Sequence, residues 1–256
     1  MRDDLAMTLR RVGARIMECR REGNTHGKWE GTQYKAVADL IADECMREWL
    51  QKIATLPIVS EEDIGSQSDQ RHGEYWLIDP IDGTASFAQG FPGFVCQAAL
   101  MRGGIAQLAG VYAPALDKLY MAIRGAGATL NGHPIRVRNA GQRKLTLVDN
   151  YPQPRGVAER LMRDLHCAEY LESGSIGLKI CLVAEGQADV FVKDVRVRDW
   201  DIAAPHLVLQ ETGGVLMQFN NQPFDYRGGY ERHGLIATSS SELFDQVNEI
   251  IVSYGA

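Results

Sequence analysis

The segment 74–87, with the sequence E-Y-W-L-I-D-P-I-D-G-T-A-S-F, constrains the fold more than any other part of the chain. Its apolar residues 75–78 predict a short buried strand. Pro80 fixes its own φ and disfavours helical geometry at Asp79, so we expect the strand to stop there. The strand then delivers two carboxylates, Asp79 and Asp82, onto the turn at its end.

The same turn continues with Gly83 and Thr84, a pair that suits an anion. Glycine lets the backbone approach a ligand closely, and free N–H groups at the start of a helical turn bind phosphate. Two carboxylates beside a phosphate need cations between them, because like charges repel. Hard oxygen ligands next to phosphate favour magnesium over zinc. A lone D-x-x-D is more often an acidic turn that caps a helix, but the preceding strand and the following G-T make this pattern more specific.

The composition narrows the class of protein. At 256 residues the chain is long enough for a full core, as one large domain or two small ones. A net charge of −6 argues against a nucleic-acid polymer as the partner, because such binding uses clustered Lys and Arg. Five widely spaced cysteines without a C-x-x-C pair indicate reduced thiols in a cytoplasmic protein. No apolar run reaches the roughly eighteen residues of a membrane span, so we expect no membrane partner.

Apolar residues at helical spacing predict two helices before the central motif, over 3–22 and 36–53. In the second helix the residues expected to face inward are Val37, Leu40, Ile41 and Cys45. Asp39 lies early in this helix, near the positive end of its dipole or facing a site. A strand over 56–60 then leads into an acidic triplet that begins with Glu61. Such a triplet is usually solvated surface, but its position shortly before the central motif makes it a candidate source of a third ligand.

Short β-suitable runs follow the central motif at close intervals, over 94–101, 106–112 and 118–123. Their spacing favours an antiparallel meander over alternating βαβ units. The pattern changes near residue 142, where we place a boundary between an N-terminal α+β half, 1–142, and a C-terminal α/β half, 143–256. No Pro/Ser-rich spacer separates the two halves, so no flexible linker is expected.

The second half contains two further segments of interest. Residues 177–185 predict a helix and residues 188–192 a strand. In R-D-W-D-I-A-A-P, Asp201 is expected to be the N-cap of a helix that ends at Gly213, with Pro205 at about its fourth position. Asp201 could act as a cap alone, or it could also hold a metal at the mouth of a cleft.

Together these motifs resemble the inositol monophosphatase superfamily of magnesium-dependent, lithium-inhibited phosphatases. The resemblance rests on the acidic pair at 61–62, W-L-I-D-P-I-D-G-T at 76–84, and W-D-I-A-A at 200–204 with G-G at 213, in that order over nearly the whole chain. It implies an α/β/α/β/α layered sandwich, of the α+β or α/β class, with the metal site between its two halves. It also implies two or three Mg²⁺ ions per site and five ligands: Glu61, Asp79, the backbone carbonyl of Ile81, Asp82 and Asp201.

The resemblance also implies the roles of other residues. Thr84 would orient the attacking water, and Asp39 matches the acidic end of the family's early V-T-x-A-D segment. The N–H groups of Gly83 and Thr84 would hold the equatorial phosphate oxygens. Glu61 would help to activate the water as a ligand of its metal. Two residues depart from the family pattern: Ala36 stands in place of Thr, and Ser86 in place of Asn. Both departures concern how the nucleophilic water is held.

The motifs point to more than one substrate. G-S-I-G-L-K at 174–179 and W-D-I-A-A-P-H resemble the 3′(2′),5′-bisphosphate nucleotidases. In that interpretation Ser175 and Lys179 bind the substrate's second phosphate or nucleoside. Asp82 and Asp201 are expected to contact the substrate as well. Lys179 could instead be a solvent-facing helix residue. The F-x-x-G-x-P segment at 87–92 is the form found in inositol and histidinol phosphate phosphatases.

We therefore expect a cytoplasmic, Mg²⁺-dependent phosphatase that hydrolyses a small phosphate monoester with a metal-activated water. A 3′(2′),5′-bisphosphate nucleotidase is the preferred interpretation. The alternatives are an inositol-1-monophosphatase, a histidinol-phosphatase and a fructose-1,6-bisphosphatase-like enzyme. A phosphosugar or nucleotide sensor that lost turnover is the alternative without catalysis. The resemblance also allows a homodimer.

Overall fold

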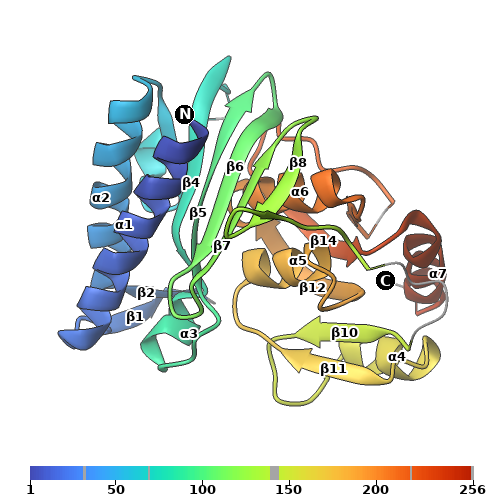
Figure 1. Cartoon of the computed structure of the whole chain (residues 1–256). Coiled ribbons are helices and arrows are strands. Elements are labelled where there is room, and N and C mark those ends of the chain that lie inside the picture. The colour runs from blue at the N-terminus through green and yellow to red at the C-terminus, as the bar shows by residue number, and fades with distance from the viewer. Residues whose placement is uncertain (31–32, 69, 139–143, 220, 255–256) are drawn as a thin grey trace.

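Helices and two β-sheets alternate in layers in the computed structural model (Figure 1). The structure describes residues 1–30, 33–68, 70–138, 144–219 and 221–254. The two helices α1 (Arg2–Arg21) and α2 (Val37–Ile53) cover one face of the first sheet. The helices α5 (Ile176–Ala184) and α6 (Asp199–Thr212) lie between the two sheets, and α4 (Val157–Asp164) and α7 (Ser241–Ser253) cover the outer face of the second. This order confirms the predicted α/β/α/β/α sandwich.

The first sheet has seven strands, in the order β3-β4-β5-β6-β7-β8-β9. Only β3 and β4 are parallel among its pairs, and the remainder is the predicted antiparallel meander. Its strands are β3 (Ile58–Ser60), β4 (Glu74–Asp82), β5 (Val95–Arg102), β6 (Ile105–Ala113), β7 (Lys118–Ile123), β8 (Gly127–Leu130) and β9 (His133–Pro134). A short antiparallel pair of strands, β1 (Gly27–Glu30) and β2 (Gln33–Ala36), precedes α2.

The second sheet has five strands, in the order β11-β10-β12-β14-β13. The strand β10 is parallel to both of its neighbours, whereas β14 is antiparallel to β12 and β13. The strands are β10 (Thr146–Asp149), β11 (Glu169–Glu172), β12 (Val190–Arg198), β13 (Val215–Met217) and β14 (Glu231–Thr238). The strand predicted at 188–192 thus starts two residues later and continues to Arg198. The boundary predicted near residue 142 lies outside the described residues, so the division into 1–142 and 143–256 stays a prediction.

Strand β4 explains how a continuous apolar run fits between two helical layers. Tyr75 and Leu77 pack into the core shared with α5 and α6, whereas Trp76 and Ile78 pack into the core shared with α1 and α2. Successive side chains of a strand point to opposite faces, so a strand covered on both sides must be apolar at every position. The run at 75–78 satisfies this requirement and fixes β4 in the middle of the molecule.

The inward face predicted for α2 is wrong at two positions. Val37 and Leu40 are 53% and 56% exposed, while the buried residues are Ala38, Asp39, Ala42, Asp43, Met46 and Leu50. Two buried aspartates account for the rotation, because both have fixed hydrogen-bond partners in neighbouring segments. Asp39 accepts hydrogen bonds from the Ala36 N–H and the Thr84 hydroxyl, and Asp43 accepts one from the Ser60 hydroxyl. Polar partners thus override the apolar periodicity.

The start of α6 also differs from the prediction. The helix begins at Asp199 with Arg198 as N-cap, so Asp201 is its third residue and Pro205 its seventh. The Asp201 carboxylate accepts a hydrogen bond from the Arg198 N–H, 2.7 Å away, which is the acidic half of a capping box. The predicted end of the helix is confirmed, since Gly213 is the C-cap with φ of 95°.

Candidate metal and phosphate site

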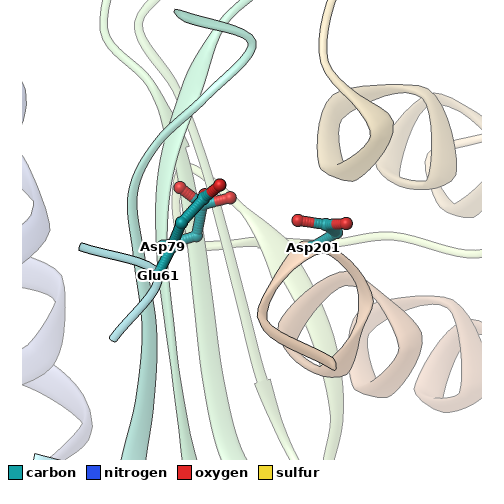
Figure 2. Close-up of side chains that lie close together, drawn as sticks. All are labelled: Glu61, Asp79 and Asp201. Atoms are coloured by element: carbon teal, nitrogen blue, oxygen red, sulfur yellow. The ribbon is translucent and has the colours of Figure 1, made fainter. Parts of the chain in front are cut away.

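Three carboxylates from three separate elements meet between the first sheet and α6 (Figure 2). Glu61 follows the end of β3, Asp79 lies in β4, and Asp201 lies in the first turn of α6. One oxygen atom from each side chain lies within 4.8 Å of the other two. The structure thus brings together three of the four carboxylates predicted as ligands.

Pro80 shapes the end of β4, although the strand does not stop before it as predicted. Asp79 pairs with Gln97 and Asp82 pairs with Val95, so the register of β4 against β5 shifts between them. Proline has no N–H for the ladder, and a bulge is where a strand accommodates it. The irregularity re-aims both acidic side chains while the strand continues to Asp82.

Asp79 is a buried carboxylate of the site whose pKa is strongly perturbed. Its side chain is 1% exposed, and neither carboxylate oxygen has a hydrogen-bond partner within the described residues. Burial, and then the negative charge of Glu61, raise the pKa of Asp79 well above its usual range. Burial and the Glu61 charge raise the pKa of Asp201 in the same way. A buried carboxylate that receives no hydrogen bond is unfavourable unless a cation lies beside it. Together with the two carboxylates that it faces, it offers the oxygen ligands that a hard divalent cation prefers.

Asp82 lies beside this group but has a partner of its own. Its carboxylate accepts a hydrogen bond of 2.6 Å from the Gly177 N–H in the first turn of α5. Burial raises the pKa of Asp82, while that hydrogen bond and the charge of Lys179 act in the opposite direction. A Cβ on Gly177 would lie only 2.4 Å from the Gln97 side-chain oxygen, so glycine is needed for this close approach.

Thr84 and Asp39 form a hydrogen-bonded pair at the edge of the site. The Thr84 Oγ1 lies 2.9 Å from a carboxylate oxygen of Asp39 and 3.0 Å from the Ile81 carbonyl oxygen. A hydroxyl carries one proton, and a carboxylate accepts it better than a carbonyl. Donation to Asp39 leaves the Ile81 carbonyl available to a cation. The second oxygen of Asp39 accepts the Ala36 N–H at 2.6 Å, which fixes the carboxylate.

Gly83 and Ser175 lie against each other. Gly83 has φ of 90°, and a Cβ there would be 3.1 Å from the Ser175 Cβ. The Ser175 hydroxyl is the N-cap of α5 and accepts a hydrogen bond from the Leu178 N–H at 2.8 Å. Ser86, where the family pattern has Asn, lies beside Gly174, because a Cβ at Gly174 would be 2.4 Å from its hydroxyl.

Lys179 is buried rather than solvent-facing, with 1% of its surface exposed. Its ammonium donates to the Gly174 carbonyl at 2.9 Å, and burial lowers its pKa to about 7. Lys193, which sequence reasoning missed, shares the Asn150 side-chain oxygen with Lys179 and lies 3.3 Å from Asp149. A single lysine inside the apolar strand V-F-V-K was the signal that could have identified it.

The comparisons with known proteins identify the family. The model of the inositol monophosphatase family matches residues 4–256, so the chain belongs to this family of phosphatases. Within the described residues, no helix is long and apolar enough to cross a membrane.

Two curated relatives carry different names. The 3′(2′),5′-bisphosphate nucleotidase CysQ of Shigella flexneri is 34% identical over 199 residues, which cover 74% of this chain and 78% of that protein. The Nus factor SuhB of Pasteurella multocida is 31% identical over 196 residues, which cover 73% of this chain and 72% of that protein. Among solved structures, the IMPase of Thermotoga maritima superposes with a TM-score of 0.82 at 25% identity, over 98% of this chain and 96% of that one.

Proposed function

We propose that this protein is a Mg²⁺-dependent phosphoric monoester hydrolase whose substrate is a 3′(2′),5′-bisphosphate nucleotide. The observation that carries the metal dependence is Asp79, a buried carboxylate without hydrogen-bond donors that faces Glu61 and Asp201. Without a cation this arrangement costs free energy, because buried like charges repel.

The donor set fits Mg²⁺, since all of its atoms are oxygens. The residues that would hold two or three ions are Glu61, Asp79, the Ile81 carbonyl, Asp82 and Asp201. When bound, Mg²⁺ supplies charge neutralisation on the transferring phosphoryl group, acidifies a water and stabilises the leaving oxygen.

The protein's own contribution to the chemical step is to orient groups. Thr84 donates its proton to Asp39, so its oxygen can accept a proton of the attacking water. Because the Ala36 N–H holds Asp39, the hydroxyl is fixed without any help from a side chain at position 36. The backbone N–H groups of Gly83 and Thr84 lie at the start of α3 (Thr84–Ala88), where the equatorial phosphate oxygens would bind.

The charge near α5 supports a substrate with a second phosphate. Lys179 and Lys193 share one amide oxygen, which brings two ammonium groups together beside the carboxylates of Asp149 and Asp82. Lys179 lies under the Gly174–Ser175 backbone, and Lys193 is the more exposed of the two. An ammonium paired with phosphate forms a charge-assisted contact. The relative named as a bisphosphate nucleotidase supports the same class of substrate.

Phosphate release across four compounds tests this function. The compounds are 3′-phosphoadenosine 5′-phosphate, inositol 1-phosphate, histidinol phosphate and fructose 1,6-bisphosphate, each with Mg²⁺ and with EDTA. We expect release with Mg²⁺ only, and the highest kcat/KM for the bisphosphate nucleotide. Release from none of them would favour a non-catalytic sensor. A preference for another compound would favour the enzyme that acts on it.

The role of Lys179 is tested by the ratio of kcat/KM for a bisphosphate substrate to kcat/KM for a monophosphate substrate. In Lys179→Met, kcat/KM for 3′-phosphoadenosine 5′-phosphate should fall about tenfold or more relative to inositol 1-phosphate, chiefly through KM, because the second phosphate does not react. Lys193→Met should shift the ratio in the same direction. An unchanged ratio in both variants would move the assignment to a monophosphate substrate.

Three further properties belong to the same proposal. Lithium should inhibit turnover, because a monovalent ion at a Mg²⁺ position supplies half the charge. All five cysteines are unpaired, which supports a reducing compartment such as the cytoplasm. A homodimer is proposed on the family resemblance, and light scattering of the purified protein tests it.

A further inference from the structure

The first turn of α6 carries Asp201 to the metal site from outside the first sheet, so its position depends on contacts between separate segments. Asp201 belongs to α6, whereas Glu61 and Asp79 belong to the first sheet and its connections. Burial, and then the charge of Glu61, raise the pKa of both Asp79 and Asp201. Because like charges repel, contacts between α6 and the segments around β4 are needed to keep these carboxylates close in the metal-free protein.

Arg71 provides a buried contact of this kind. It lies in the connection from β3 to β4, and its guanidinium forms an ion pair of 2.5 Å with Asp199, the first residue of α6. The two side chains are only 8% and 1% exposed. Other guanidinium nitrogens donate to the Gly228 carbonyl at 2.7 Å and to the Tyr75 hydroxyl at 3.3 Å. The guanidinium also stacks on Tyr230, 3.4 Å above the ring centre.

A second contact joins β5 to the first turn of α6, and it depends on Pro205. Pro205 has no N–H, so the carbonyl of Asp201, four residues earlier, lacks its helical donor. The Gln97 side-chain amide in β5 donates to this carbonyl at 3.1 Å and to the Trp200 carbonyl at 2.8 Å. The β3–β4 connection therefore holds the first turn of α6 at a side chain, and strand β5 of the first sheet holds it at the backbone.

We propose that Arg71 is a positioning residue for the metal site, which holds Asp201 against Glu61 and Asp79 through its ion pair with Asp199. This inference rests on the proposed metal dependence and extends it to a residue that touches neither metal nor substrate. A fixed outer-shell partner is a known determinant of metal affinity. Arg71 is well suited to this role because its planar fork satisfies several acceptors at once.

Coulomb's law alone makes the opposite prediction, and that makes the proposal testable. Removal of a positive charge near a cation site should strengthen Mg²⁺ binding if charge is all that matters. Loss of positioning should weaken it. The sign of the change in Mg²⁺ affinity therefore separates the two effects.

The experiment is isothermal titration calorimetry of the full chain with Mg²⁺, together with phosphate release at increasing Mg²⁺. We expect Arg71→Met to raise the Kd for Mg²⁺ about tenfold, with most of the lost phosphate release restored at saturating Mg²⁺. The matched control is Arg102→Met. Arg102 forms an exposed ion pair of 2.6 Å with Glu74 across β4 and β5, and its loss should leave the Kd unchanged.

Several outcomes decide the matter. A lower Tm with an unchanged or lower Kd in Arg71→Met would mean that Arg71 is only structural and would overturn the proposal. If Arg71→Met does not fold, Arg71→Lys keeps the charge and loses the fork, and its Kd should still rise several-fold. An unchanged Kd there overturns the proposal equally. No binding of Mg²⁺ by the wild-type protein would instead refute the metal site itself, and the role of Arg71 with it.

Discussion

At the scale of single residues, the proposed site contains ionisable groups whose burial is unfavourable. Asp79 is buried without a donor, and Lys179 is a buried lysine with a pKa of about 7. Both residues cost stability in the metal-free, substrate-free protein, as expected where function sets the residue type. Each therefore gives a prediction about stability as well as one about activity.

Asp79→Asn should stabilise the metal-free protein. The change removes one of three facing negative charges and supplies N–H donors to the carboxylates of Glu61 and Asp201. We expect the free energy of unfolding to rise by about 1 kcal/mol, or roughly 2–4 °C in Tm. Thermal unfolding in EDTA measures this. A variant less stable than the wild type in EDTA would show that repulsion in the cluster is negligible.

The folding stability of the wild-type protein should rise with pH above about 7, and Lys179→Met should abolish this rise. Burial lowers the pKa of Lys179 to about 7, whereas the unfolded chain keeps a lysine near 10.5. Between these values the unfolded state binds a proton that the folded state lacks, so stability rises with pH by up to about 1.4 kcal/mol per unit. Below about pH 7 both states are charged and this gain is absent.

Urea denaturation at pH 7, 8 and 9 checks this prediction. The rise should be present in the wild type and lost in Lys179→Met. The control Lys52→Met removes a lysine that is exposed beside Glu48, and it should keep the rise. A pH profile of Lys179→Met that matches the wild type would contradict a depressed pKa at this position.

At the scale of elements, three helices direct their N-terminal ends at the site, and each meets one aspartate. Asp39 and Asp201 are third residues of α2 and α6 and accept the N–H of the residue before each helix. Asp82 accepts the Gly177 N–H of α5. The positive ends of helix dipoles favour negative charge, so these helices partly offset the repulsion among the acids.

The N-terminus of α2 gives a prediction for an element. Ala36 is its N-cap, with φ of −116° and ψ of 161°, and it has no side chain that can accept a hydrogen bond. Ala36→Ser should stabilise the protein by about 1 kcal/mol, because serine is a strong N-cap. The opposite change at a known cap, Ser240→Ala in α7, removes an acceptor for the Leu243 N–H and should cost a similar amount. No gain in Tm for Ala36→Ser would mean that the site leaves no room for the hydroxyl.

Some elements could be predicted from the sequence and others could not, and the reasons are physical. The strand at 75–78 was predictable because burial on both faces demands apolar residues at every position. The face of α2 was not, because Asp39 and Asp43 turn it toward partners that are distant in sequence. The start of α6 was three residues off, since Asp201 accepts the Arg198 N–H from inside the helix rather than capping it.

At the scale of the whole molecule, the site exists only where the layers meet. The resemblance predicted four carboxylates as metal ligands, and the fold brings three of them, Glu61, Asp79 and Asp201, together from segments far apart in the chain. Gln97 and Arg71 were not predictable, because their roles depend on which segments become neighbours, whereas Lys193 could have been noticed as a lysine at the end of an apolar run. Pattern reasoning thus finds residues within a motif, and misses the residues that join one motif to another.

Phosphate release by two variants tests most directly whether carboxylates from the first sheet and from α6 form one hydrolytic centre. Asp79→Asn and Asp201→Asn should each lower Mg²⁺-dependent release from 3′-phosphoadenosine 5′-phosphate by at least about a hundredfold, and the double variant should lose little more, because residues that act as a unit are not additive. Folding is checked by thermal unfolding of each variant. Either single variant that folds and keeps more than about a tenth of the wild-type rate, with unchanged Mg²⁺ dependence, would contradict a shared centre.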